Sequence, residues 1–377
     1  MAKLISADLT NNKLCIFEYT TIGWQMLSFK KDAFNAKIVS HTYTNIGKVI
    51  FDKPITRIGE RAFEHCTSLT SVTIPDSVTT IGEGAFAGCK SLKEFKGKFA
   101  ADGGRCLIKG NTIIAYAEAS GTTYTIPDSV TTIGYGAFEH CTSLTSVNIP
   151  DSVTTIGDGA FRYCYSLTSV NIPDSVTTIG EAAFWYCDSL TSVNISNSVI
   201  TIGKSAFSSC RSLKEFKGKF AADGGRCLII DGVLNAFAIG CGVTQYTIPD
   251  SVTTIGKAAF SHCKSLTSVT IGNSVTTIGN LAFCWCSGLA SVTIPDSVTT
   301  IGKYAFCDCS NLTRVTIGRG VSEIGKEAFK SCYIETVVCY PKIPPKINDS
   351  FDRFENLIVP TGCEEAYANS DWGKYLE

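Results

Sequence analysis

The eighteen cysteines of this 377-residue chain are the side chains with the widest chemical range, because thiols form disulfides, bind metals and act as nucleophiles. Ten of them recur at regular intervals, each three residues after a phenylalanine. They are Cys66, Cys89, Cys141, Cys164, Cys187, Cys210, Cys263, Cys286, Cys309 and Cys332. A buried free thiol packs like a small apolar group. The regular placement therefore predicts one buried row of inert packing groups, and we call these ten the cysteine row.

Two further cysteines, Cys284 and Cys307, lie outside the cysteine row and occupy equivalent positions 23 residues apart. On adjacent coils of a repeat their Cα atoms fall near the separation of about 5 to 6 Å that a disulfide can bridge. We therefore expect a disulfide or a reactive thiol pair there. Cys227 and Cys241 form a weaker candidate pair, and their redox state is left open.

The histidines and the remaining cysteine pairs do not predict a catalytic or metal centre. His65, His140 and His262 share one motif position directly before a cysteine of the row. A nucleophile, its base and the orienting group must converge in one place, whereas repetition puts the same residue on separate coils. Zinc requires four converging ligands, which the row cysteines next to Cys284 and Cys307 do not offer. We expect no catalytic residue, no cofactor and no metal.

The spacing of these residues reflects a 23-residue period. One copy runs over residues 156–178 and the next over 179–201, each reading I-G-x-x-A-F-x-x-C-x-x-L-x-x-V-x-I followed by a Pro-Asp or related turn. A fixed period with apolar residues at fixed offsets is typical of a solenoid. V-x-I predicts a strand with inward apolar residues, and successive copies predict a parallel sheet. A-F-x-x-C is short and predicts a single helical or 3₁₀ turn on the other face.

Three segments depart from the period. Residues 1–43 lack it and are expected to cap the first coil, while residues 44–339 form the repeat solenoid. Two insertions at about 96–124 and 217–246 share the words Phe-Lys-Gly-Lys-Phe and Gly-Gly-Arg-Cys-Leu-Ile, and their glycine turns predict β-hairpins. Residues 340–377, rich in proline at their start, are expected to close the solenoid as a C-terminal cap.

Charge and hydropathy limit the functional classes. The net charge of −1 argues against nucleic-acid binding by bulk electrostatics. The chain has no run of about 18 apolar residues, so we expect no transmembrane segment. The N-terminal residues lack the apolar run of a signal peptide. We therefore expect either a protein that stays inside the cell or an exported one whose leader has been removed.

Two surfaces are candidates for binding. The outward strand positions carry hydroxyl and amide side chains, with Asn148, Asn171 and Asn194 on successive coils, and form either a solvated face or a recognition surface for a glycan or an extended polypeptide. Aromatic residues gather around the A-F-x-x-C turns, where they are expected to form a binding hot spot or to pack locally over the coil edge. These residues are Tyr163, Tyr165, Trp185, Tyr186 and Trp285.

The run of residues 126–147, Ile-Pro-Asp-Ser-Val-Thr-Thr-Ile-Gly-x-x-Ala-Phe-x-x-Cys-x-Ser-Leu-Thr-Ser-Val, resembles the BspA-like class of leucine-rich repeats. The resemblance covers roughly residues 44–362. It implies a right-handed leucine-rich-repeat superhelix on a bacterial surface, an adhesin that binds a protein or glycoprotein of the host extracellular matrix or of other microbes. The alternatives are an intracellular or secreted protein-binding scaffold and a structural stalk. The ligand, the binding face and the oligomeric state stay open.

Overall fold

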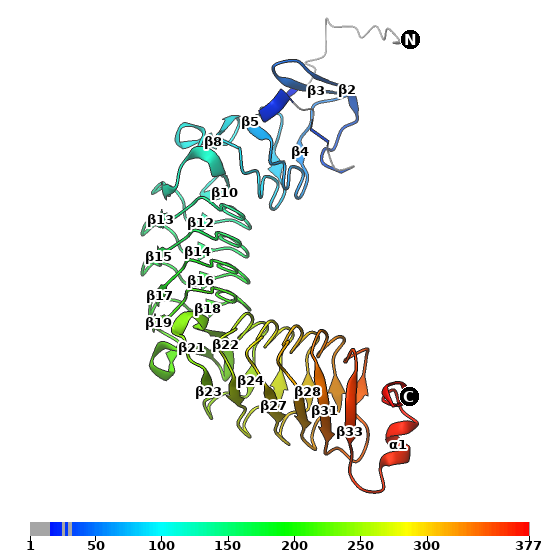
Figure 1. Cartoon of the computed structure of the whole chain (residues 1–377). Coiled ribbons are helices and arrows are strands. Elements are labelled where there is room, and N and C mark those ends of the chain that lie inside the picture. Colours follow the sequence, from blue (N-terminus) through cyan, green and yellow to red (C-terminus); the bar gives the residue numbers. More distant parts are fainter. Residues whose placement is uncertain (1–15, 25–26, 29–31, 377) are drawn as a thin grey trace, which may run out of the picture.

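The computed structural model describes residues 16–24, 27–28 and 32–376. The chain winds into a solenoid that is bent twice, so that its three runs of coils form an open arc (Figure 1). Each coil contributes one longer strand and one two-residue strand, and these stack into separate parallel sheets. Among the described residues no helix has both the length and the apolar character needed to cross a membrane.

The longer strands form the outer side of the arc (Figure 1). They are β5 (Leu69–Ile74), β7 (Glu94–Gly97), β11 (Thr123–Thr125), β13 (Ser146–Asn148), β15 (Ser169–Asn171), β17 (Ser192–Ile195), β19 (Glu215–Gly218), β23 (Gln245–Thr247), β25 (Ser268–Thr270), β27 (Ser291–Ile294), β29 (Arg314–Ile317), β31 (Ile334–Cys339) and β33 (Phe354–Ile358). Neighbouring strands pair through equivalent residues of successive repeat copies, as Val147 pairs with Val170. The predicted strand of each copy is therefore confirmed.

The two-residue strands come from the Thr-Ile pair that precedes each motif glycine, or from its equivalent. They are β4 (Arg57–Ile58), β6 (Thr80–Ile81), β12 (Thr132–Ile133), β14 (Thr155–Ile156), β16 (Thr178–Ile179), β18 (Thr201–Ile202), β24 (Thr254–Ile255), β26 (Thr277–Ile278), β28 (Thr300–Ile301), β30 (Glu323–Ile324) and β32 (Lys346–Ile347). The hydroxyl of Thr177, the residue before β16, donates a hydrogen bond to the Thr154 carbonyl oxygen one coil earlier, and the equivalent threonines of other coils do the same. These hydroxyls therefore join neighbouring coils.

The core between the sheets is a stack of the motif phenylalanines. Phe161 and Phe184 are fully buried, with ring centroids 5.1 Å apart and planes within 7°. The row cysteine Cys187 is also fully buried, and its thiol donates a hydrogen bond of 3.2 Å to the Phe161 carbonyl oxygen of the preceding coil. Burial raises the pKa of this thiol well above its usual value. Such a thiol packs as the sequence predicts and stays unreactive.

Each A-F-x-x-C segment forms isolated turns with i→i+3 hydrogen bonds, as from the Cys164 amide to the Phe161 carbonyl. Two residues per turn have positive φ, for example Ala182 at 54° and Tyr186 at 60°. A left-handed residue cannot continue a right-handed helix. The turns therefore stay short, and they lie on the inner side of the arc (Figure 1).

The two insertions lie at the two bends (Figure 1). The first contains β8 (Ala100–Ala101), η2 (Asp102–Gly104), β9 (Cys106–Lys109), β10 (Thr112–Tyr116) and η3 (Glu118–Ser120). The second contains β20 (Ala221–Ala222), η4 (Asp223–Gly225), β21 (Cys227–Ile230), β22 (Val233–Phe237) and η5 (Ile239–Cys241). Strands β9 and β10 pair antiparallel, and β10 starts a new sheet by pairing in parallel with β12. Each hairpin thus ends one run of coils and begins the next.

The N-terminal residues enter the first sheet. They contribute β1 (Ile16–Thr21), η1 (Ile22–Trp24), β2 (Ile38–Tyr43) and β3 (Gly47–Phe51). Strand β1 runs antiparallel to both β3 and β5, so it lies between two strands of the array. Phe17 and Tyr19 alternate with polar residues and bury their rings in the core. That residues 1–43 cap the first coil stays a prediction, which falls in part on residues 1–15, outside the described residues.

The C-terminal residues cover the last coil with α1 (Glu364–Ala368) and η6 (Gly373–Tyr375). Trp372 is fully buried, and its indole N–H donates to the Pro345 carbonyl at 2.9 Å. The Tyr367 hydroxyl donates to the Pro341 carbonyl at 2.8 Å. These contacts shield the end of the phenylalanine stack from water.

Candidate functional site

A row of neighbouring rings, some stacked and some edge to face, lies along the inner side of the arc. Its members all precede a cysteine of the row, and all have φ between 58° and 67°. They are His65, His140, Tyr163, Tyr186, His262 and Trp285. The centroids of successive rings are 4.7, 4.4, 5.4, 5.4 and 5.9 Å apart. We call this set the aromatic row.

The aromatic row continues across both bends because each coil that carries an insertion has a small residue at the aromatic position, directly before its row cysteine. These residues are Gly88 and Ser209, both buried. A Cβ on Gly88 would come within 2.4 Å of the His65 ring, so a larger side chain would separate His65 from His140. Side chains of the coil before the insertion-bearing coil therefore contact side chains of the coil after it.

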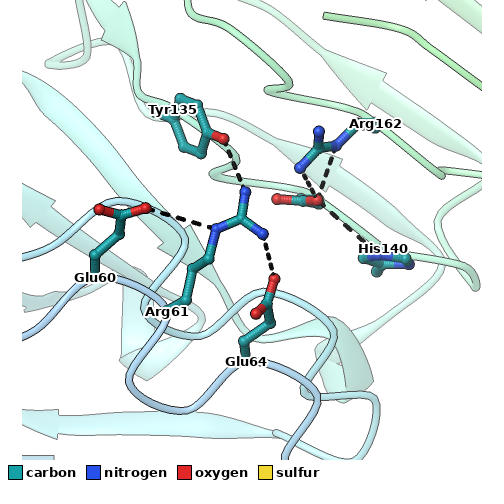
Figure 2. Close-up of polar contacts among 7 residues, drawn as sticks. Glu60, Arg61, Glu64, Tyr135, His140 and Arg162 are labelled. Carbon is teal, nitrogen blue, oxygen red and sulfur yellow. Dashed lines mark hydrogen bonds and ion pairs between the residues drawn. The ribbon is translucent and has the colours of Figure 1, made fainter. Parts of the chain in front are cut away.

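Polar contacts join the first bend (Figure 2). The Arg61 guanidinium donates to the Tyr135 hydroxyl at 3.0 Å, 74 residues along the chain, and to Glu64 at 2.6 Å. Next to this contact, within the run of coils that follows the bend, Arg162 donates two hydrogen bonds to the carboxylate of Glu139 on the preceding coil, which is 4% exposed. A buried carboxylate needs this charge-assisted pairing.

Contacts of the same kind join the second bend. The Tyr186 hydroxyl is hydrogen bonded to His262 Nε2 at 2.7 Å, and Lys257 pairs with Glu181 at 3.0 Å. The Ser205 hydroxyl donates to the Lys257 carbonyl at 2.8 Å. Burial, assisted by Arg211 and Lys264, lowers the pKa of His262 to about 4. The ring is therefore neutral at pH 7.

A cavity of about 180 Å³ opens on the inner side at the second bend. A cavity of about 150 Å³ accommodates a benzene-sized group, so this one has room for a small ring or side chain. Charged side chains of both signs lie beside aromatic rings in its wall. They are Asp158, Arg162, Glu181 and Lys257 together with Tyr135 and Trp185. The Trp185 indole N–H is buried and has no hydrogen-bond partner among the described residues.

The five aromatic residues that the sequence proposes for binding differ in burial and in location. Tyr163 and Tyr186 are half-buried in the aromatic row, which matches the local-packing alternative. Trp185 lines the cavity, with its ring 5.6 Å from that of Tyr163. Tyr165 and Trp285 are 39% and 45% exposed. Tyr165 and Trp285 are thus the most accessible of the five, and a role of all five in binding stays a prediction.

The asparagines lie where the sequence places them. Asn148, Asn171 and Asn194 pair in register on β13, β15 and β17, and all three side chains are exposed on the outer side of the arc. They do not contact the aromatic residues of the inner side. The chain thus offers two separate candidate surfaces.

The cysteine pair outside the row is brought together. The sulfur atoms of Cys284 and Cys307 lie within bonding distance, and their Cα atoms are 4.7 Å apart, which suits a disulfide. The Asp308 carboxylate is close to both sulfurs. Cys227 and Cys241 are not bonded to one another; Cys227 instead accepts a hydrogen bond from the Tyr246 hydroxyl at 3.5 Å.

Sequence reasoning missed Arg61, Tyr135, Glu139 and Arg162. The contact of Arg61 with Tyr135 skips one coil and an insertion, so it does not appear at the 23-residue period. Arg162 and Glu139 are 23 residues apart on neighbouring coils, but their pairing does not recur in the other copies. A usable signal was the small residue Gly88 in the aromatic position next to the insertion, which marks where two distant coils approach.

The sequence profile of the BspA type leucine rich repeat region, in six copies, matches residues 15–98, 113–221 and 234–357. The gaps between these ranges fall in the two hairpins. No curated protein matches the chain.

Solved structures share the fold. A leucine rich cell surface protein from Faecalibacterium prausnitzii A2-165 is 29% identical, with 90% of this chain and 89% of that one covered and a TM-score of 0.65. A leucine-rich repeat protein from Eubacterium ventriosum is 21% identical, with 78% and 73% covered and a TM-score of 0.53. The pneumococcal vaccine antigen PcpA is 18% identical, with 84% and 82% covered and a TM-score of 0.51. The last two likenesses concern the fold alone.

The profile match over most of the chain agrees with the stacked coils and with the likeness to a cell surface protein. The chain therefore belongs to the BspA-type leucine-rich repeat family and is a repeat-built binding module.

Proposed function

We propose that this protein is a bacterial surface adhesin that binds a host matrix glycoprotein or a microbial surface glycan through the inner side of its second bend. The cavity beside Trp185 carries this proposal. Aromatic rings offer a flat apolar face to a sugar ring or an apolar side chain, and Trp and Tyr are favoured at binding hot spots. The neighbouring charges, which include Lys257 and Glu181, supply hydrogen bonds that select an orientation.

The proposal is tested by binding of the purified chain to immobilised matrix glycoproteins and to a panel of glycans. Trp285→Ala removes an exposed ring and Trp185→Leu removes the ring in the cavity wall. Each should weaken binding at least about tenfold if the ring is a hot spot. Tyr333→Ala is the matched control, because Tyr333 is 67% exposed and lies away from the cavity.

The surface location is a separate part of the proposal, supported by the name of the Faecalibacterium neighbour. Protease treatment of intact source cells should release fragments of the chain. Protection until the cells are lysed would contradict a surface location and favour the scaffold.

The exposed asparagine face supports the scaffold as a second candidate. Three amides in register present donors and acceptors at the strand spacing of about 4.8 Å, which suits an extended polypeptide. Asn171→Ala should then weaken binding while Trp285→Ala leaves it unchanged. A chain that binds none of the immobilised ligands would favour a stalk.

A further inference from the structure

The C-terminal end of the third run of coils carries an open groove. Its volume is about 730 Å³, within the range of about 300–1,000 Å³ that is usual for ligand sites. One wall is the turn of residues 319–322, which follows β29, and the other is the loop of residues 340–344, which follows β31, with Lys346 and Pro360 beside it. The groove shares no residue with the cavity at the second bend. It is therefore a separate candidate surface.

Apolar side chains in the wall of this groove are open to water. Ile343 is 83% exposed, the largest fraction among the exposed large apolar side chains of the described residues, and Tyr340 is 48% exposed. A single exposed apolar residue is ordinary. Here the two lie in one concave wall together with Pro344 and Pro360, which are partly exposed. Exposed apolar groups that gather in this way mark an interaction site.

The loop that presents Ile343 is fixed at both ends by the C-terminal residues. The Pro341 carbonyl accepts a hydrogen bond from the Tyr367 hydroxyl at 2.8 Å, and the Pro345 carbonyl accepts one from the Trp372 indole N–H at 2.9 Å. Each proline ring also fixes the φ of its own residue. The isoleucine is thus held in water by a loop with little conformational freedom. A loop fixed in this way loses little entropy when a partner binds to it.

The charged side chains in the wall of the groove are all basic. They are Arg319, Lys342 and Lys346. Two acids lie near them, since Asp296 pairs with Arg319 at 3.3 Å and Glu323 is in register with Lys346 on the neighbouring strand. Neither lysine forms an ion pair with another described residue. The groove therefore keeps positive charge for a partner of the opposite sign.

The other copies of the repeat provide an internal comparison. Where this coil has Arg319, six other copies have the aspartate of a Pro-Asp-Ser turn, namely Asp76, Asp128, Asp151, Asp174, Asp250 and Asp296. The next turn is also longer, because five residues (318–322) lie between the paired strands in one coil and six (340–345) in the next. The repeat closes its other coils with an acidic turn, so a basic groove with an exposed isoleucine is not needed to build the fold.

We propose that this groove binds a segment of another protein in which acidic residues flank an apolar side chain. Ile343 and the Tyr340 ring, over which the Arg319 guanidinium lies at 6.0 Å, contact the apolar side chain, and Lys342 and Lys346 pair with the carboxylates. Tyr and Arg are favoured at binding hot spots. A flat membrane surface does not enter a concave wall, and an acidic glycan has no aliphatic side chain to cover the isoleucine. A polypeptide supplies both groups.

The test exposes the full chain to an array of short synthetic peptides of random sequence. We expect the bound peptides to be enriched in Asp and Glu next to an apolar residue. The peptide that binds most tightly is then labelled with fluorescein and titrated with the chain by fluorescence anisotropy. Ile343→Ser and Lys342→Glu should each weaken its binding at least about tenfold, and added NaCl should weaken it further. Both positions are exposed, so neither substitution disturbs the fold.

Ile200→Ser is the matched control, because Ile200 is 70% exposed and lies outside the groove. Trp185→Leu should also leave the affinity unchanged, which separates this groove from the cavity at the second bend. Absence of peptide binding, bound peptides without an excess of acidic residues, or equal affinity in Ile343→Ser would overturn the proposal. Self-association, or binding to phosphatidylglycerol vesicles, that is lost in Ile343→Ser while no peptide binds would overturn it in favour of a second copy or a membrane.

Discussion

Tyr186 and His262 are 76 residues apart in the chain, yet the tyrosine hydroxyl and the imidazole Nε2 are joined by a 2.7 Å hydrogen bond across the second bend. Their rings also meet edge to face, with centroids 5.4 Å apart. The angle of the bend thus depends on side chains of the turns as well as on the inserted hairpin.

Removal of this hydrogen bond should loosen the second bend. Tyr186→Phe keeps the ring and leaves His262 Nε2 unpaired, so we expect a loss of about 1 kcal/mol in the free energy of unfolding. Urea denaturation measures it. Tyr163→Phe is the control, because the Tyr163 ring stacks on Tyr186 but does not bond across the bend. Equal losses in the two variants would contradict the role given to the hydroxyl.

Acidification should weaken the first bend through His140. Burial, with His65 and Arg162 adding to it, lowers the pKa of His140 from 6.5 to about 4 in the folded chain. The unfolded chain binds the proton more readily, so the stabilisation is present above pH 6.5 and is lost as the pH falls toward 4. The ring is 18% exposed, and allowing for this we expect a loss of roughly 2 kcal/mol.

The comparison that isolates His140 is His140→Tyr, which places at this position the ring that position 163 carries. Urea midpoints of both proteins are measured between pH 7 and pH 4.5. The slope against pH should be smaller in the variant, because all other titrating groups are shared. Identical slopes would show that His140 does not contribute.

The Cys284 and Cys307 pair is predicted to form a disulfide under oxidising conditions. Mass spectrometry of the denatured, alkylated chain should show these two thiols protected before reduction and modified after it. A bridge that closes a loop of 23 residues stabilises a fold by about 3 kcal/mol. Cys284→Ser should lower the stability of the oxidised protein only. Alkylation of both thiols without a reductant would contradict the bridge.

Gly88 is predicted to tolerate no side chain. Its φ of +69° costs an L-residue about 1–2 kcal/mol, and a Cβ would also meet His65 at 2.4 Å. Gly88→Ala should therefore destabilise more than Gly103→Ala, where φ is +63° and no atom lies within 4 Å. The difference between the two urea midpoints measures the contact. Equal losses would mean that backbone strain alone is responsible.

The 23-residue period predicts everything that one coil shares with the next. The strand of V-x-I, the phenylalanine stack and the cysteine row, which is buried except for the partly exposed Cys66, depend on offsets that recur. The approach of Cys284 to Cys307 follows from the same rule. Neighbouring coils are a fixed distance apart, so equivalent residues must meet.

The bends could not be predicted in this way. The contact between Arg61 and Tyr135 joins coils that are not neighbours, and its geometry depends on how far the inserted hairpin tilts one run against the next. For the same reason the sequence indicates that Tyr186 belongs to an aromatic cluster without showing that it bonds to His262. Strand β1 was missed because its pairing is antiparallel and lies outside the repeat.

The hairpins interrupt the sheets, and this has a mechanical consequence. A pull along the arc would load few hydrogen bonds at a bend and a whole ladder of them within a run of coils. The side-chain contacts of the inner side, among them Lys257 to Glu181, would part before any coil unwinds. The molecule would then lengthen by straightening at the two bends, while each run of coils stays folded and moves as a rigid body.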